Sequence, residues 1–389
     1  MNRRVSLVWT GIITLSLLFT SVGQVAAAPD AANGPARKIV VFQESVGQAA
    51  QDKIIDRAGA AKIKHLGLVN AAVVMATPAA EKALAKHAEV LRIEDDAVAA
   101  ILGKPTKPGQ PPPTQPVQDL TWGVDRIDAD LVWGTGNTGT NIKVAVVDTG
   151  IDLTHPDLAV AGGYNAISAR KSYADDNGHG THVAGIIAAK NNTIGVIGVA
   201  PGASLYSVKV LDRNGSGWIS DIIEGIEWSV VNRMQVINMS LGSSTSVQSF
   251  HDAIIAAKNA GIVIVAAAGN SGDGDNTVEY PGAYPEVIAV SATNDSNLIA
   301  SFSSRGLEVD LAAPGVNIFS TYKGGSYATY SGTSMAAPHV AGVAALVLSS
   351  GYLGDVRVRL QSTADDLGVS GTDSLYGYGL VDAEEAAAG

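Results

Sequence analysis

The segment NGHGTHVAG at residues 177–185 holds two of the seven histidines of the chain, His179 and His182. Residues three apart on a helix lie on the same side, so the two imidazoles could share a metal ion. Alternatively, one imidazole is a general base and the other is packed in the core. A zinc site would lack a third ligand here, because the chain has no cysteine and no Glu-x-x-His sequence follows.

Three polar residues stand at the ends of predicted elements, where a purely structural α/β core would not need them. Asp148 ends the apolar run KVAVVD, His179 opens HGTHVAGIIAA, and Ser334 opens SMAAPHVAGVAALVLS. Nucleophilic catalysis requires a hydroxyl, an imidazole that takes its proton and a carboxylate that orients the imidazole. An aspartate at a strand end or a serine at a helix start is by itself usually structural. The joint occurrence of all three predicts a nucleophilic site.

The elements that would position these residues alternate along residues 118–389. Apolar, β-branched runs bounded by turns predict buried strands, and helical patterns lie between several of them. The strands are expected at 142–148, 204–211, 236–240, 262–269 and 287–293, and the clearest helices at 221–233 and 249–261. This order predicts an α/β fold, a three-layer α/β/α domain with a mostly parallel sheet. Active sites of such sheets lie at the carboxyl ends of the strands, where Asp148 is expected.

Three segments precede this domain. Residues 1–27 combine Arg3 and Arg4 with an apolar run and small residues, which is typical of a secretory signal peptide; the run is short for the alternative, a membrane anchor. Residues 36–102 predict a small α+β domain. Its expected elements are a strand at 38–43, a helix at 47–60, a hairpin at 66–77, a helix at 78–89 and a strand with a tail at 90–102. Residues 103–117 contain six prolines and are expected to form an exposed linker.

Composition excludes several classes of protein. The chain of 389 residues is 46% hydrophobic and 16% charged, which is typical of a packed globular protein. Residues 118–389 carry 28 acidic and 13 basic side chains, a net charge of −15 that disfavours a nucleic-acid partner and is compatible with bound cations. Without cysteine, an exported protein lacks disulfides and needs another means of stabilisation.

Three motifs of the chain resemble the active-site motifs of the subtilisin family of serine endopeptidases. They are VAVVDTGID, NGHGTHVAG and SGTSMAAPHVAG, in the order Asp, His, Ser, and the likeness extends through VKVLDRNGSG, VINMSLG, AAAGN and FSSRG. It covers nearly all of residues 118–389 and implies a subtilisin-like peptidase domain. Residues 36–102 would then be its inhibitory propeptide and intramolecular chaperone.

The resemblance implies an acyl-transfer mechanism. Ser334 would attack the scissile carbonyl, His179 would take its proton, and Asp148 would hold the imidazole. Asn270 of AAAGN matches the amide that binds the oxyanion together with the Ser334 backbone N–H. His182, and likewise His339 in the serine helix, would be packed structural histidines.

The resemblance also implies a structural calcium ion as the missing stabiliser. The loop KNNTIGV and the Asp157 segment match a tight calcium site of the family. The side-chain ligands would be Gln118, Asp157 and Asn192, and the carbonyl ligands those of Lys190, Ile194 and Val196. Such oxygen ligands suit a hard cation. A weaker second cation site is considered near Gly282, Tyr284, Val287 and Asp310.

The family's specificity pocket maps to two short segments, Ser240–Leu241–Gly242 and Ala267–Ala268–Gly269. Their small, apolar residues suit large apolar side chains. Glu279, before YPG, is expected at the pocket floor if it points inward, where it would pair with Lys or Arg. The propeptide is expected to be cut after Leu102, and a second cut inside the proline-rich linker is considered.

Two other functions are weighed. GTGNTG at residues 134–139 fits a dinucleotide-binding pattern, but it precedes a strand and opens no helix. No G-x-S-x-G is present, which disfavours an α/β-hydrolase. The sequence therefore predicts a secreted, extracellular, monomeric serine endopeptidase that processes itself and cleaves polypeptides, with neither nucleic-acid nor membrane partners after signal removal. The alternative is an inactive binding module on the same fold.

Overall fold

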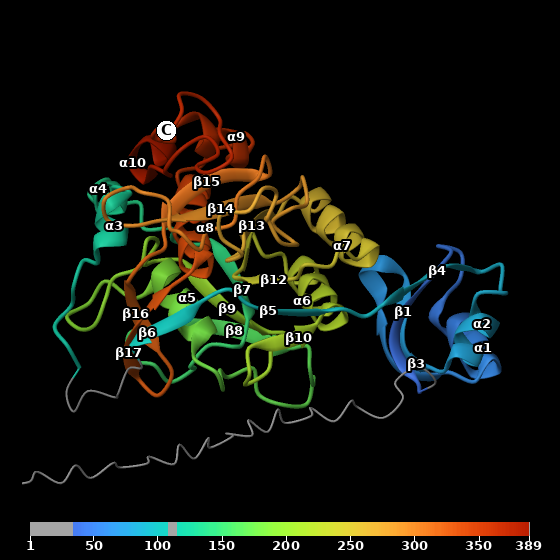
Figure 1. The fold of residues 1–389 in the computed structure, drawn as a ribbon. Coiled ribbons are helices and arrows are strands. Elements are labelled where there is room, and N and C mark those ends of the chain that lie inside the picture. Colours follow the sequence, from blue (N-terminus) through green and yellow to red (C-terminus); the bar gives the residue numbers. More distant parts are fainter. Residues whose placement is uncertain (1–33, 108–114, 389) are drawn as a thin grey trace, which may run out of the picture. The chain divides into compact units, whose positions relative to one another are not determined.

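The N-terminal part of the chain folds into a four-stranded antiparallel sheet. The computed structural model describes residues 34–107 and 115–388, so the predicted signal peptide lies outside the described residues. The strand order is β2-β3-β1-β4, and two helices pack on the sheet (Figure 1). The elements are β1 (Ala36–Phe42), α1 (Gln48–Ala58), β2 (Ala61–Leu66), the 3₁₀ turn η1 (Gly67–Val69), β3 (Ala71–Ala76), α2 (Pro78–Leu84) and β4 (Val90–Asp95).

The predicted α+β character of this part is confirmed, with three differences in detail. The hairpin is formed by β2 and β3 across η1, and not within residues 66–77, because the polar run AKIKHL pairs as an edge strand. Helix α2 ends at Leu84, five residues before the expected end. The expected last strand is two strands, β4 and β5 (Val98–Ile101), which pair in different sheets.

A seven-stranded parallel sheet forms the centre of the rest of the chain; the sequence predicts its parallel character and five of its strands. Its order is β15-β14-β13-β11-β7-β9-β8. The strands are β7 (Lys143–Asp148), β8 (Val160–Asn165), β9 (Ser204–Lys209), β11 (Val236–Met239), β13 (Val263–Ala267), β14 (Ile288–Thr293) and β15 (Val309–Pro314). The expected strands are therefore confirmed, each shorter than predicted by one to three residues.

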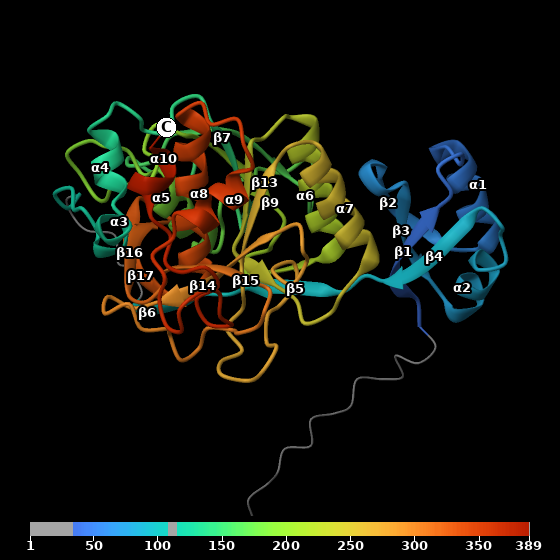
Figure 2. The same cartoon turned by 90° about the horizontal axis from the view of Figure 1, so that it is seen from above.

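Helices cover both faces of this sheet. Helices α5 (His179–Ala188) and α8 (Thr333–Ser349) lie on one face, and α6 (Ile219–Val231) and α7 (Gln248–Asn259) on the other (Figure 2). Alternation along β7 explains the two cores: Val144 and Val146 belong to the first, Ala145 and Val147 to the second. The buried, near-continuous apolar strands are those expected of a parallel sheet covered on both sides.

Two small antiparallel sheets border the central one. The first has the order β10-β5-β12, with β10 (Ser216–Trp218) and β12 (Leu241–Gly242) flanking β5. The second has the order β16-β17-β6, from β16 (Ile318–Tyr322), β17 (Ser326–Ser331) and β6 (Lys104–Lys107). Strands β5 and β6 both come from the region between the N-terminal sheet and the central sheet, so this region enters both small sheets (Figure 1).

Four short helices complete the described chain: α3 (Trp122–Arg126), α4 (Ala129–Trp133), α9 (Val356–Ser362) and α10 (Ala383–Ala387). The GTGNTG segment is a turn between α4 and β7, with positive φ at Gly136 and Gly139, so the dinucleotide-binding pattern has no helix to open. Within residues 34–107 and 115–388, no helix is long and apolar enough to cross a membrane.

Candidate active site

The carboxyl end of β7 and the first turn of α5 bring Asp148 and His179 together. His179 Nδ1 lies 2.8 Å from Asp148 Oδ1 and 2.9 Å from Oδ2, and both side chains are buried. Because a carboxylate accepts, Nδ1 carries the proton and Nε2 is left as the basic nitrogen. Among the described residues Nε2 has no hydrogen-bond partner. It faces Gly103, where an added Cβ atom would lie 3.1 Å away.

Ser334, the second residue of α8, lies at the same edge of the sheet. Its Oγ donates to the carbonyl oxygen of Ser240 at 2.9 Å and accepts from the backbone N–H of Leu102 at 3.1 Å. In this rotamer the hydroxyl points to Ser240 and makes no hydrogen bond to His179. A rotation about χ1 would move Oγ among its staggered positions, and catalytic hydrogen bonds are often unformed outside the reacting complex.

The carbonyl oxygen of Leu102 lies between two donors. Asn270 Nδ2 donates to it, and the backbone N–H of Ser334 donates at 3.4 Å. Asn270 is itself oriented, because its Oδ1 accepts from the backbone N–H and the hydroxyl of Thr333, both at 3.0 Å. A Cβ atom at Gly332 would collide with this same carbonyl oxygen, which explains the small residue before α8. Two donors converging on one carbonyl form an oxyanion-binding arrangement.

The residues before Leu102 are held as an extended strand. Strand β5 pairs antiparallel with β10, from Val98 opposite Trp218, and with β12, where Ile101 lies opposite Leu241. Main-chain pairing on both sides of a bound strand is sequence-tolerant, while alternate side chains enter pockets. The Leu241–Gly242 segment therefore borders the strand that ends at Leu102.

The Leu102 side chain is buried, and a carboxylate lies close to it across Gly242. A Cβ atom added at Gly242 would lie 2.7 Å from Leu102 Cδ1 and would collide with Glu279 Oε2. The Glu279 backbone N–H donates to Ala268 O at 2.8 Å, which joins it to the opposite wall. Gly269, next in that wall, would place a Cβ atom 3.1 Å from Glu279 Cγ. The partly exposed Glu279 side chain thus lies beside Gly242 and Gly269, and Ser271 Oγ donates to its Oε1 at 3.0 Å.

Asp175 is a site residue that the sequence reasoning missed. Its Oδ1 accepts from Thr149 Oγ1 and from the backbone N–H groups of Asn177 and Gly178, each at 2.9 Å. Its Oδ2 accepts from the backbone N–H and the hydroxyl of Thr181, at 3.0 and 2.5 Å. Burial raises the pKa of Asp175, and these hydrogen bonds oppose that rise.

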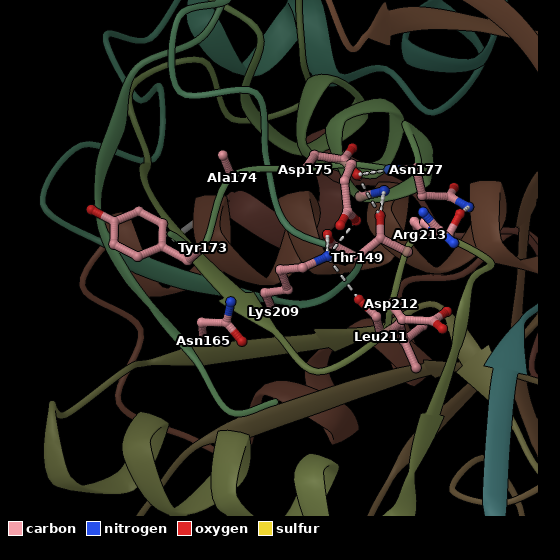
Figure 3. Close-up of polar contacts among 12 residues, drawn as sticks. Thr149, Asn165, Tyr173, Ala174, Asp175, Asn177, Lys209, Leu211, Asp212 and Arg213 are labelled. Atoms are coloured by element: carbon pink, nitrogen blue, oxygen red, sulfur yellow. Dashed lines mark hydrogen bonds and ion pairs between the residues drawn. The ribbon is translucent and has the colours of Figure 1, made fainter. Parts of the chain in front are cut away.

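This carboxylate therefore ties the residue after Asp148 to the segment around His179 (Figure 3). Lys209 supports the same junction from the neighbouring strand, because its Nζ donates to Thr149 O at 2.6 Å. The sequence signal was the acidic pair immediately before NGHGTH, which a search for Asx turns preceding a helix would have found.

The two further histidines are packed in the core, as expected. His182 Nε2 donates to the carbonyl oxygens of Ile318 and Ala328, both at 3.1 Å, and burial lowers its pKa to about 3. His339 Nδ1 donates to Met335 O at 2.8 Å, and burial lowers its pKa to about 4. Within the described residues no group of three or more His, Asp or Glu side chains could hold a metal ion, so the shared-metal hypothesis for His179 and His182 gains no support.

The residues expected to bind calcium do lie together. Asp157 is fully buried and accepts from three neutral donors: Asn192 Nδ2 at 2.8 Å, the Val196 backbone N–H at 2.9 Å and the Tyr327 hydroxyl at 3.3 Å. Gln118 Nε2 donates to Lys190 O at 2.9 Å, and the Ile194 backbone N–H donates to Asn192 Oδ1 at 2.7 Å. A buried carboxylate bonded only by neutral donors, beside carbonyl and amide oxygens, fits a hard cation.

At the second cation site considered near Gly282, Tyr284, Val287 and Asp310, the carboxylate already has a cationic partner. Asp310 Oδ1 accepts from Arg357 Nε at 2.9 Å and Nη2 at 2.7 Å. Gln361 Nε2 donates to the same oxygen at 2.7 Å. A guanidinium therefore supplies the positive charge that a metal ion would have provided.

Comparisons with known proteins identify relatives of this chain. The model of the subtilase family matches residues 139–379. The chain is similar to subtilisin E of Bacillus subtilis (strain 168), at 44% identity over 97% of this chain and 98% of that protein. It is 52% identical to subtilisin of Bacillus pumilus over 69% of this chain and 99% of that protein. It is also 40% identical to the minor extracellular protease Epr of Bacillus subtilis (strain 168), over 95% of this chain and 57% of that protein.

Proposed function

This chain belongs to the subtilase family, and from that premise we propose which of its residues perform the reaction. The protein is a subtilisin-like serine endopeptidase that acts on polypeptides. Asp148, His179 and Ser334 are its catalytic triad, and Asn270 with the Ser334 backbone N–H binds the oxyanion. The observation that supports this most directly is the Leu102 carbonyl, whose oxygen accepts from both proposed oxyanion donors while Leu102 N–H contacts Ser334 Oγ.

The reaction begins when Ser334 Oγ turns from Ser240 O and attacks the carbonyl carbon of the bound residue. His179 Nε2 takes the hydroxyl proton, and Asp148 stabilises the resulting imidazolium through Nδ1. Asn270 Nδ2 and the Ser334 N–H hydrogen-bond the oxygen as it gains charge. His179 then returns the proton to the leaving amine. Water then attacks the acyl carbonyl carbon while His179 takes its proton, and His179 returns that proton to Ser334 Oγ as it leaves, which releases the carboxylate product and restores Ser334.

Casein hydrolysis tests this assignment. A covalent serine-directed inhibitor should abolish hydrolysis, and Ser334→Ala should leave a folded, uncut precursor without peptidase activity. Ser350→Ala, at the other end of the same helix, is the matched control and should process itself normally. Self-processing of Ser334→Ala with no other protease present would contradict the assignment. A wild-type protein that folds but does not cleave casein would instead favour the inactive binding module.

The domain boundaries follow from the same proposal. Residues 1–27 are a signal peptide, residues 36–102 an inhibitory propeptide and chaperone, residues 103–117 a linker, and residues 118–389 the peptidase, which acts outside the cell as a monomer. Cleavage falls between Leu102 and Gly103, because this bond has its carbonyl at Ser334 and its amino side beside His179 Nε2. N-terminal sequencing of the mature enzyme tests this: Gly103, or a trimmed start within the linker, supports the proposal, and a start well inside residues 118–389 contradicts it.

We further propose a structural calcium ion at Asp157. Its ligands would be the side-chain oxygens of Gln118, Asp157 and Asn192 and the carbonyls of Lys190, Ile194 and Val196. The ion would neutralise a buried carboxylate and crosslink the loop after α5 to the start of the peptidase domain. Specificity is assigned to the pocket bordered by Ser240, Leu241, Gly242, Ala268, Gly269 and Glu279, which would accept large apolar and basic side chains.

A further inference from the structure

The uncut chain is anchored on both sides of its proline-rich linker. On one side, Leu102 is bound through its carbonyl oxygen at Ser334 and Asn270. On the other side, Gln118 donates from Nε2 to Lys190 O at 2.9 Å and from its backbone N–H to Thr193 O at 3.2 Å. Both contacts exist in a single chain in which the bond after Leu102 is intact.

The flanking residues strengthen each anchor. After Leu102, strand β6 pairs antiparallel with β17, so the chain leaves the active site along that strand. Before Gln118, Pro116 O accepts from the backbone N–H of Gly195 at 2.9 Å, and Val117 forms a β-bridge with Ile194. Asp119 continues the pairing, since its backbone N–H donates to Gly195 O at 2.8 Å. The loop that carries the proposed calcium ligands is thus completed by the strand around Gln118.

The length of the linker makes the two anchors compatible. If Gln118 followed Leu102 directly, their Cα atoms would lie about 3.8 Å apart. No residue that the structure shows hydrogen-bonded to Leu102 is also hydrogen-bonded to Gln118. Fully extended, residues 103–117 can span roughly 50 Å, so the chain can bind at the active site and at the loop together.

We propose that the linker allows calcium to bind and stabilise the precursor before the bond between Leu102 and Gly103 is cut. Gln118 and the strand around it complete the ligand set at Asp157 while the propeptide still occupies the active site. Rotation of the Gln118 side-chain amide places its oxygen, in place of its nitrogen, beside Lys190 O, where the oxygen can bind calcium. Processing is then not required for calcium binding, and the peptidase domain reaches its calcium-stabilised form while it is still inhibited. This proposal rests on the proposed peptidase function and its calcium site.

Calorimetry of the uncut Ser334→Ala precursor tests the proposal without any activity measurement. Calcium chloride, compared with a chelator, should raise its melting temperature by roughly 5–10 °C, as expected for a site filled about a hundredfold above its dissociation constant. Titration calorimetry should detect one bound calcium ion per precursor. Asp157→Asn in the same background should abolish both effects, and Gln118→Ala should weaken them.

Linker variants of the Ser334→Ala precursor separate length from sequence. Deletion of residues 103–117 should remove the calcium response, because Gln118 could no longer leave the active site. Replacing residues 108–114 by the same number of Gly and Ser residues should keep the calcium response. This variant also tests the proposal if the deletion variant does not fold.

The proposal is overturned if calcium stabilises the mature, inhibitor-blocked enzyme but not the uncut precursor. A lack of response in both forms would also overturn it, by removing the calcium site. Casein hydrolysis by the wild type would be unaffected by either result, so the peptidase assignment is tested separately.

Discussion

Substitution of Glu279 by Gln should change which residue the enzyme prefers at the cleavage site. The Glu279 carboxylate lies beside Gly242, against which the Leu102 side chain packs. A Lys side chain entering in place of Leu102 would bring its ammonium toward Glu279 Oε2, whereas a Phe side chain would gain nothing from the charge. Gln preserves the shape of the side chain and an oxygen that can accept from Ser271 Oγ, but it removes the charge.

The expected size follows from the burial of this carboxylate. A hydrogen bond to a charged group contributes about 1.5–3 kcal/mol. Because Glu279 is partly exposed, solvent screening places the effect near the lower limit, ~1.5 kcal/mol, which corresponds to roughly a tenfold change in kcat/KM. The ratio of kcat/KM for the Lys substrate to that for the Phe substrate should therefore fall about tenfold in Glu279→Gln. Only kcat/KM for the Lys substrate should change.

Matched peptide substrates that differ only at the residue before the cleaved bond provide the assay. Added salt should lower the Lys-to-Phe ratio of the wild type and leave that of Glu279→Gln unchanged, because only the wild type has the charge pair to screen. Glu286→Gln, which removes an equal charge that contacts His251, is the control and should keep the wild-type ratio. An unchanged ratio in Glu279→Gln would refute the assignment of this carboxylate to the pocket.

Three other predictions concern positioning, calcium and pH. Asp175→Asn should lower kcat about a hundredfold with little change in KM and should shift the pH profile, because His179 loses its orientation. The neighbouring Asp176→Asn is the control. Equal losses of kcat in the two variants would argue against a positioning role of Asp175. Chelation of calcium from the mature enzyme should expose the loop at residues 190–196 to autolysis. Sequencing of the fragments should therefore place the first cuts within this loop. Burial keeps His182 and His339 neutral in the folded protein, whereas in the unfolded chain they take up protons below the ordinary histidine pKa of 6.5. The free energy of unfolding should therefore decrease as the pH falls below 6.5. Each should contribute a loss of about 2 kcal/mol between pH 7 and pH 5 in urea unfolding of the Ser334→Ala precursor, and His339→Gln should remove one such contribution.

The parallel character of the sheet could be predicted from the sequence, and the triad residues could be proposed from it, because both signals are local. Five of the seven strands of the central sheet, β7, β9, β11, β13 and β14, are short apolar runs between turns, and alternation of such runs with helices favours a covered parallel sheet. Asp148, His179 and Ser334 each lie within a short motif whose glycines and small residues allow close backbone approach. Gly332 illustrates this, because a Cβ atom there would collide with the Leu102 carbonyl oxygen.

Tertiary structure alone decided the features that join distant segments. Arg357 pairs with Asp310, 47 residues away, which is the carboxylate of the second cation site that the sequence suggested. Asp175 connects β7 to α5 through five hydrogen bonds, although its sequence resembles an ordinary turn. The direction of Glu279 and the simultaneous anchoring of Leu102 and Gln118 likewise depend on which side chains and carbonyls meet across the fold. Sequence periodicity determines which face of an element is buried, but the partner at a given contact is determined by packing between elements, and packing is a property of the whole folded chain.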